Sequence, residues 1–215
     1  MGAALDRLPT HETMVDNIIR LWGESDTYAH ESGTSWYDVA LGHAQDMATE
    51  YNVDLWQAVA IIASLSPQTE WTRNLDEARE LLSRWTMGLE ITPRNIGTTQ
   101  DRLNRCFLAL ANDTSDIARV KGTRKVASFF RAILGDPDAV TVDRHAYRVA
   151  LGDPTLDAPG KITDAVYRAI AAAYREAATH IGEEPRVLQA ITWTHVVETR
   201  LGLAEATRQT VQEPL

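Results

Sequence analysis

The stretch from residue 122 to residue 145 reads GTRKVASFFRAILGDPDAVTVDRH, which predicts a turn, a helix and a return strand. Apolar residues at helical spacing follow the Gly-Thr turn, and Gly135 then ends the helix. Such a helix climbs roughly 15 Å, and an extended chain over residues 136–142 covers up to about 23 Å. The eighteen-residue step from Lys125 to Asp143 therefore predicts that these two side chains converge. An amine and a carboxylate in one cleft suit chemistry at a sugar carbon, as nucleophile and as charge stabiliser or base.

Most of the remaining chain has a helical pattern. Apolar residues recur at intervals of three and four, which predicts an all-α fold. Only residues 139–142 have a β-like composition, and they are too few for a sheet of their own. We expect the stretches 88–97 and 152–160 to connect packing units. The predicted helices centre on residues 14–22, 36–47, 55–62, 71–82, 103–110, 162–174 and 187–196.

Three helix starts are marked by their sequence. Asp54 precedes one apolar pattern, as an N-cap residue does. Thr98 and Asp101 have the spacing of a capping box. Pro185 fits the first turn of the last helix.

Length and composition are those of a soluble globular protein. The chain has 215 residues, of which 44% are hydrophobic and 24% charged, and we expect a single helical domain over residues 1–215, with one large or two small lobes. The N-terminal sequence lacks a secretory signal and no 18-residue apolar run occurs, so we expect a cytoplasmic protein with no membrane partner. The single cysteine, Cys106, excludes an internal disulfide.

Cysteine content also bears on cofactors. One thiolate is too few for an iron–sulfur cluster or a cysteine-based zinc site, and we expect no metal or other cofactor. Because Cys106 lies in an apolar helical pattern, it is predicted to be a buried, inert thiol.

Charge is distributed unevenly along the chain. The net charge of −9 argues against a nucleic-acid partner, because phosphate contacts supply most non-specific affinity. Residues 102–148, however, carry nine Arg and Lys against five Asp. An acidic protein with one basic face can dock on a polyanion, and the alternative is an ordinary solvated surface.

Four stretches in order resemble the helix-hairpin-helix DNA glycosylase superfamily, in particular its endonuclease III-like branch. They read AIIASLSPQT over residues 60–69, VKGTRKVASFF over 120–130, VDRHAYRVALG over 142–152 and LQAITWTH over 188–195. The resemblance covers residues 54–201, with the hairpin and catalytic segment at 118–152. It implies a two-lobed helical fold with the active-site cleft between the lobes.

The resemblance implies two catalytic residues. Asp143 matches the aspartate that stabilises the oxocarbenium-like sugar or activates the attacking group. Lys125 matches the lysine that attacks the sugar carbon and forms a Schiff base. The alternatives are that Lys125 is a helix-terminal cation contacting phosphate and that Asp143 is the N-cap of the next helix, a role compatible with catalysis.

The resemblance also implies a partner, double-stranded DNA with an extruded base. Gln68 matches the residue that fills the gap left by the extruded nucleotide, and Trp71 stacks there or packs in the core. His145 orients Asp143, donates a hydrogen bond as a neutral imidazole, or is structural. Lys121, Gly122, Thr123 and Arg124 match the phosphate-binding hairpin and its flanks. Arg144 is the neighbour of Asp143. Gln189 and Trp193 match the late helix that lines the pocket.

Several departures separate the chain from the superfamily. The hairpin reads KGTR without a second glycine, Arg144 stands where a threonine is usual, and the four-cysteine cluster of many members is absent. The combined stretches look closer to glycosylase-like proteins of bacteriophages. Some of these resemble transferases of hypermodified thymine synthesis, in which an amine displaces pyrophosphate from an activated 5-hydroxymethyluracil in DNA.

Three hypotheses for the function follow. The first is a DNA glycosylase, with or without AP-lyase activity, that extrudes a base and acts on its sugar. The second is a phage transferase that adds an amino acid or polyamine to the extruded pyrimidine, in the host cytoplasm if the chain is phage-encoded. The third is a non-catalytic helical module that binds DNA or protein.

Overall fold

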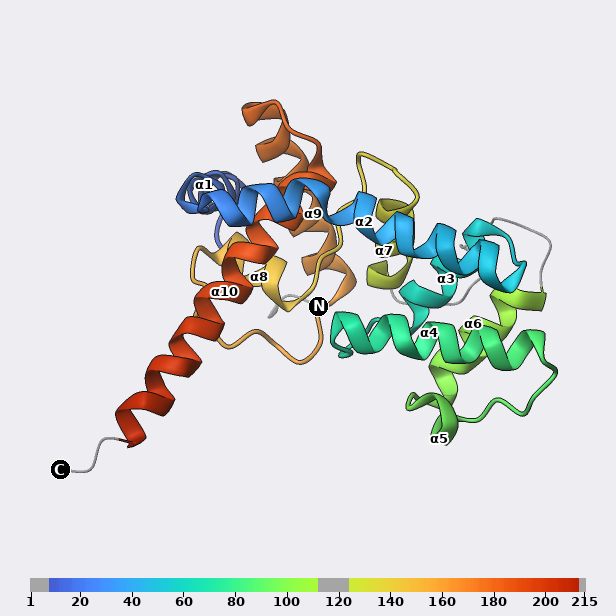
Figure 1. Ribbon diagram of the computed structural model, residues 1–215. Coiled ribbons are helices and arrows are strands. Elements are labelled where there is room, and N and C mark those ends of the chain that lie inside the picture. The colour runs from blue at the N-terminus through green and yellow to red at the C-terminus, as the bar shows by residue number, and fades with distance from the viewer. Residues whose placement is uncertain (1–7, 112–123, 213–215) are drawn as a thin grey trace. The chain divides into compact units, whose positions relative to one another are not determined.

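The computed structural model describes residues 8–111 and 124–212, and within these ranges the chain is all-α (Figure 1). The all-α prediction is confirmed. No helix in the described ranges is long and apolar enough to cross a membrane. The helices are α1 (His11–Glu24), α2 (Thr27–Tyr51), α3 (Leu55–Leu65), α4 (Trp71–Thr86), α5 (Pro93–Ile96), α6 (Gln100–Ala111), α7 (Arg124–Ile133), α8 (Arg144–Leu151), α9 (Asp164–Ile181) and α10 (Pro185–Gln212).

Each of the seven apolar patterns corresponds to an observed helix, and the helix predicted after the hairpin is α7. This helix ends just before Gly135, whose φ of 91° lies in the left-handed region that favours glycine. Asp54 is the N-cap residue of α3, and its N–H donates to the Gln57 side chain at 2.9 Å. Pro185 is the first residue of α10, as predicted.

Two local predictions are wrong. Residues 139–142 form no strand, because no partner strand exists in the described ranges. Thr98 does not cap α6, which begins at Gln100, and the Thr98 hydroxyl is buried without a hydrogen-bond partner. The short α5, which was not predicted, ends at Gly97 in a left-handed turn that shifts the start of α6.

The chain folds into two compact units. Unit 1 comprises Met1–Tyr37 and Pro137–Leu215, and unit 2 comprises Asp38–Asp136. The predicted connections 88–97 and 152–160 each lie inside one unit, so that prediction is wrong. Apolar periodicity shows which face of a helix is buried, but it does not show which other helix covers that face. The packing of the N-terminal helix with the C-terminal helices therefore could not be predicted from periodicity.

In unit 1, α1, α8, α9 and α10 pack around one hydrophobic core. The core includes Ile18 of α1, Val149 of α8, Tyr174 of α9 and Leu188 of α10, all fully buried. Helix α9 also buries several alanines, and such small side chains let α1 approach it closely. The unit therefore presents α8 on a rigid support.

In unit 2, α3 is the central helix and packs against α4, α6 and α7. Every residue of α3 from Ala58 to Leu65 is buried, as expected for a helix surrounded by other elements. The Gln57 amide at its start donates to the carbonyl of Ala109 at 3.2 Å, which ties α3 to the end of α6. The start of α3 is thereby anchored to α6.

A glycine in α2 sets the distance to α10 within unit 1. A Cβ added to Gly33 would lie 2.4 Å from the Ile191 Cα atom. We predict that Gly33→Ala lowers the free energy of unfolding by about 1–3 kcal/mol through overpacking. Gly42→Ala in the same helix is the control, because nothing lies within 4 Å of its added Cβ, and it should stabilise by about 0.5–1 kcal/mol. Urea unfolding of both variants tests this, and equal effects would contradict it.

Candidate active site

The 137–143 segment, which precedes α8, is held by side chains instead of a sheet. Tyr167 of α9 donates its O–H to the Val140 carbonyl at 2.8 Å and accepts the Val142 N–H at 3.2 Å. Both bonds are buried. Because buried backbone groups require partners, this phenol stabilises the path of the chain just before Asp143.

A second buried phenol connects the same segment to α10. Tyr37 of α2 donates to the Gln189 side-chain oxygen at 2.9 Å and approaches the Thr141 hydroxyl at 3.3 Å. Burial raises the pKa of Tyr37, so its phenol stays a donor. Gln189 is only 4% exposed, and its role as a direct contact to an extruded base stays a prediction.

Asp143 lies half-buried at the N-cap of α8. Its Oδ1 atom accepts the backbone N–H groups of His145 at 2.8 Å and of Ala146 at 3.0 Å. The N-cap prediction for Asp143 is therefore confirmed. The cap holds the carboxylate at the positive end of the helix dipole, where a negative charge is stabilised.

Aromatic rings surround the start of α8. The His145 ring lies 5.8 Å from the Trp193 ring of α10 in an edge-on arrangement. Trp193 in turn lies 6.4 Å from Trp36 of α2. His145 and Trp193, which were predicted separately, thus meet next to Asp143, and both are half-buried.

Burial, with help from neighbouring arginines, favours a neutral imidazole at His145. Burial lowers the pKa of His145 below its ordinary value, and the Asp143 carboxylate opposes that shift. Guanidinium groups add to the lowering, from Arg148, Arg144 and Arg200. An imidazole in this state can donate or accept a hydrogen bond without carrying a charge at neutral pH.

Sequence reasoning missed two of these arginines, Arg148 of α8 and Arg200 of α10. The signal was present, because Arg148 follows His145 by three residues and Arg200 follows Trp193 by seven. Both spacings put the arginine on the same helix face as the predicted residue. Arg144, which was predicted, is exposed.

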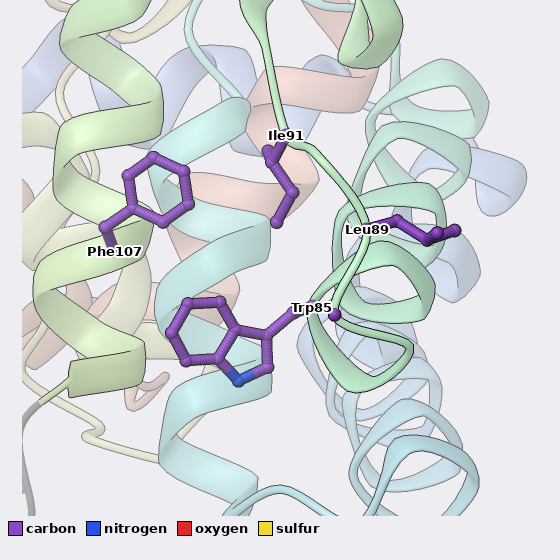
Figure 2. Close-up of a pocket in the computed structure, with 5 residues that line it drawn as sticks. Trp85, Leu89, Ile91 and Phe107 are labelled. Carbon is purple, nitrogen blue, oxygen red and sulfur yellow. The ribbon is translucent and has the colours of Figure 1, made fainter.

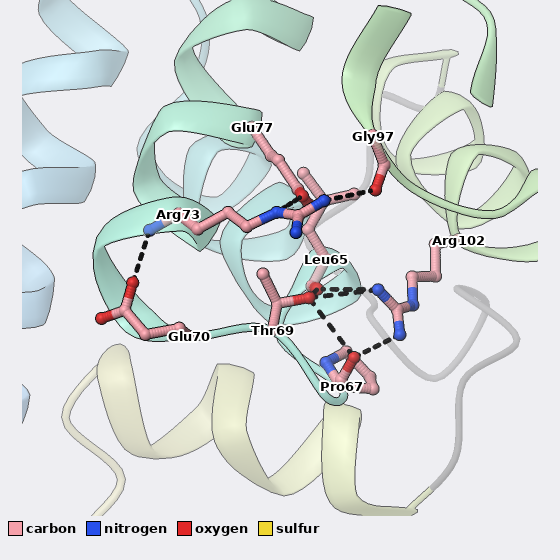
Figure 3. A network of polar contacts seen from close by, with 8 residues as sticks. All are labelled: Leu65, Pro67, Thr69, Glu70, Arg73, Glu77, Gly97 and Arg102. Carbon is pink, nitrogen blue, oxygen red and sulfur yellow. Dashed lines mark hydrogen bonds and ion pairs between the residues drawn. The ribbon is translucent and has the colours of Figure 1, made fainter. Parts of the chain in front are cut away.

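In unit 2, Gln68 lies in the exposed turn between α3 and α4, as predicted. Its φ of 58° is in the left-handed region, which is uncommon for a residue other than glycine. Arg102 of α6 holds the turn, since its guanidinium donates to the Thr69 hydroxyl at 3.1 Å and to the Pro67 carbonyl (Figure 3). The turn therefore presents Gln68 in a fixed, strained backbone conformation.

The start of α4 is fixed by its own cap. Glu70 accepts the N–H groups of Thr72 and Arg73, both at 3.0 Å, and these bonds lower the pKa of the Glu70 carboxyl. Trp71 is the first residue of α4 and is half-buried, with its ring 6.3 Å from that of His43 in α2. This contact agrees with packing, one of the two roles that we considered for Trp71.

A polar network continues along α4. Arg73 donates to Glu77 at 2.7 Å and to the carbonyl of Gly97 at 3.1 Å (Figure 3). Glu77 is buried, and its second carboxylate oxygen has no hydrogen-bond partner. The network links α4 to the end of α5.

The predicted nucleophile lies at the start of α7. Arg124 and Lys125 are the first two residues of this helix, and Lys125 is half-buried. The hairpin residues Lys121, Gly122 and Thr123 lie outside the described residues. Lys125 belongs to unit 2 and Asp143 to unit 1, and the convergence of the two side chains stays a prediction.

The predicted residues are thus divided between the units. Unit 1 brings together Asp143, His145 and Trp193, with Gln189 in the core beneath them. Unit 2 contains Gln68, Trp71, Arg124 and Lys125.

Unit 2 also has an open, apolar surface pocket of about 300 Å³ that the sequence did not indicate. In Figure 2 the side chains of Trp85, Ile91 and Phe107 face one another, and Leu89 points away from them. The rings of Trp85 and Phe107 are 6.3 Å apart. The lining consists of Trp85, Gly88, Leu89, Ile91 and Phe107, which lacks the convergent polar groups of a typical catalytic pocket.

Cys106 has the environment predicted for it. It is fully buried in α6, and burial raises the pKa of its thiol to about 12. The thiolate is the reactive form, so this cysteine is inert, and the prediction is confirmed.

These observations define an all-α protein with two compact units and a candidate site built on a helix-capping carboxylate, an imidazole and arginines. The chain belongs to the DUF7178 family, described as a family of unknown function, whose model matches residues 5–200. No curated protein and no solved structure matches the chain.

The support of Asp143 by Tyr167 can be tested directly. We predict that Tyr167→Phe lowers the free energy of unfolding by about 1–3 kcal/mol, because it leaves buried backbone groups of Val140 and Val142 unpaired. Tyr28→Phe is the control, since Tyr28 is 59% exposed and should change stability by less than about 0.5 kcal/mol. Denaturant unfolding measures both, and an unchanged Tyr167→Phe would show that the phenol is dispensable.

Proposed function

We propose that this protein is a DNA base-processing enzyme that extrudes a nucleotide into a pocket, and most simply a DNA glycosylase, with or without AP-lyase activity. The proposal includes the two-lobed helix-hairpin-helix glycosylase fold that the sequence resembles. The observation that carries it is the placement of Asp143, a carboxylate fixed at a helix N-cap beside the His145 and Trp193 rings.

Asp143 has the features that the proposed chemistry needs. An oxocarbenium-like sugar is stabilised by a carboxylate held in place before the reaction, because no reorganisation is then required. The two backbone hydrogen bonds to Oδ1 supply that preorganisation. In this proposal Lys125 attacks the sugar carbon, and the amine forms the Schiff base of a lyase step.

Gln68 supports the same proposal from unit 2. Strained backbone conformations persist where the surrounding structure enforces them, and they are frequent at functional sites. Arg102 enforces this one through the Pro67 carbonyl and the Thr69 hydroxyl. An exposed amide on a braced turn is suited to enter a duplex and fill the space of an extruded nucleotide.

One observation favours the second hypothesis, a transferase that modifies the extruded pyrimidine. Arg144, Arg148 and Arg200 act electrostatically on His145, next to Asp143. Guanidinium groups suit a substrate that carries a phosphate ester or pyrophosphate. This enzyme would use Asp143 without breaking the glycosidic bond, and it would not need Lys125 as nucleophile.

Borohydride trapping on an oligonucleotide with an abasic site tests the glycosylase proposal. We predict a covalent adduct with the wild type and its loss in Lys125→Ala, because only the amine forms the Schiff base. We also predict that Asp143→Asn lowers the rate by at least about 100-fold. Asn caps helices as well as Asp does, so this variant removes the charge and retains the fold.

Two control variants match these changes. Lys161→Ala removes an exposed lysine of unit 1 and should still form the adduct. Asp26→Asn alters another helix-capping aspartate, which accepts the Ala29 N–H at 2.8 Å, and should keep the wild-type rate. If no adduct forms, and activated 5-hydroxymethyluracil DNA gains mass in the presence of an amine, the transferase hypothesis replaces the glycosylase proposal. Absence of DNA binding at low salt would contradict both enzymes.

Gln68 allows a test that separates function from stability. We predict that Gln68→Gly raises the free energy of unfolding by up to about 1 kcal/mol, because glycine relieves the positive φ, while it weakens base extrusion. Asn52→Gly is the matched control, since Asn52 also has a positive φ, of 50°, at the end of α2. It should leave base extrusion unchanged. Unfolding and 2-aminopurine fluorescence on duplex DNA give the two readouts, and equal extrusion by both variants would remove Gln68 from the site.

A further inference from the structure

One face of α8 collects nitrogen donors. Arg144, His145 and Arg148 are spaced so that they lie on neighbouring positions of the helix surface. Arg200 of α10 adds a fourth basic side chain, close enough to lower the pKa of Arg148 together with Arg144. Helices α8 and α10 pack against each other, so the four groups share one region of unit 1.

Two nitrogens of this group are buried without partners. Arg148 is only 5% exposed, and its Nη1 atom has no hydrogen-bond partner. The Nδ1 atom of His145, one helical turn away, is also buried and unpartnered. A buried donor without an acceptor is costly, and a charged one more so, which points to an acceptor that occupies this position in the functional state.

The remaining donors of the arginines hold the loop between α8 and α9. Arg148 donates its Nε–H to the Leu156 carbonyl at 2.7 Å. Arg200 donates to the carbonyls of Pro154 and Thr155, at 3.2 and 3.1 Å. These acceptors are neutral carbonyls, so these hydrogen bonds do not pair Arg148 or Arg200 with a carboxylate.

We propose that Arg148, with Arg200, Arg144 and His145, forms a binding site for a phosphoryl group. The phosphoryl oxygens accept from Arg148 Nη1 and from the neighbouring guanidinium groups. His145 lies one helical turn from Arg148 and supplies a further donor when Nδ1 carries the proton. This site deepens the transferase hypothesis, which already matches these arginines to a phosphate ester or pyrophosphate. The identification of the phosphoryl group as part of a DNA substrate rests on the proposed function, whereas phosphate binding itself does not.

Charge favours an anion over a water molecule or a cation. The charged groups that act on Arg148 are two arginines, Arg144 and Arg200, against two carboxylates, Asp143 and Asp157. With Arg148 itself, these groups comprise three guanidinium groups and two carboxylates, which leaves one positive charge in excess. Asp143 already accepts two backbone N–H groups with Oδ1, which engages part of its negative charge in the helix cap.

The loop explains how an anion reaches a buried nitrogen. Its carbonyls occupy the guanidinium donors that a phosphoryl oxygen would take over, and hydrogen bonds between two charged groups are stronger than those to a neutral carbonyl. In this proposal a phosphoryl oxygen accepts from the unpartnered Arg148 Nη1 and competes with the carbonyls of Pro154, Thr155 and Leu156 for the neighbouring guanidinium donors. Hydrogen bonding within the loop, such as the Leu156 N–H to the Asp153 carbonyl at 3.3 Å, would change in the same step.

The test is a titration of the full chain with inorganic phosphate at constant ionic strength, followed by NMR of labelled arginine and histidine side chains. We expect saturable shifts of the Arg148 Nε–H and the His145 ring. Arg148→Met should weaken phosphate affinity at least about tenfold, since a hydrogen bond to a charged group is lost. Arg148→Lys retains the charge without the planar fork and should weaken it by less.

Arg20→Met is the matched control. Arg20 also donates to a carbonyl of the same loop, that of Gly152 at 2.8 Å, but its charge is paired with Glu24 at 2.9 Å. A variant that only loosens the loop would behave like Arg20→Met, whose phosphate affinity should equal that of the wild type. Arg200→Met provides a second binding variant if Arg148→Met does not fold, and it should also weaken binding.

Two competitors distinguish the source of the phosphoryl group. Duplex DNA that displaces phosphate assigns the site to a backbone phosphate, and pyrophosphate that displaces it more strongly than duplex DNA assigns it to a small phosphate ester or diphosphate. Either result supports the site. Absence of a saturable shift, or equal affinity in the wild type, Arg148→Met and Arg200→Met, would overturn it. The titration involves neither Lys125 nor base release, so its failure is distinct from failure of the proposed function.

Discussion

The candidate site depends on one buried phenol. An irregular segment inside an all-α unit has no ladder to pair its backbone groups, and unpaired groups would be expelled toward solvent. Tyr167 solves this for the 137–143 segment by bonding the Val140 carbonyl and the Val142 N–H at once. The segment can then remain buried and deliver Asp143 at a defined position.

The path from that segment determines the groups around it. Once Asp143 is fixed, its carboxylate caps α8 and sets where the helix begins. The rotation of α8 then decides that His145 meets the Trp193 ring and that Arg148 is directed beneath the loop toward Leu156. A helix-capping residue therefore does more than stabilise α8, because it sets which side chains share the site.

Features that depend on contacts between residues close in the sequence could be predicted, and features that depend on contacts between distant residues could not. Helices and the Asp143 cap were predictable because their signals are local, and the partners of Asp143 lie two and three residues away. The support by Tyr167 was not predictable, because its hydroxyl accepts the N–H of Val142, which lies 25 residues away in the sequence. Arg102 braces Thr69 across 33 residues, so the sequence identified Gln68 without indicating its strained backbone. The boundaries of the two units were not predicted for the same reason.

The two units also differ in the kind of buried polar atom that they leave unpaired. In unit 2 these atoms are oxygens, such as those of Ser64, Asn74 and Glu77 among the described residues, and a buried water can satisfy an oxygen by donating to it. Next to Asp143 they are nitrogens, and Arg148 Nη1 belongs to a permanent cation. A water accepts from such a donor without balancing its charge, whereas an anion does both. The region beside Asp143 is therefore where the protein has the most to gain from a ligand.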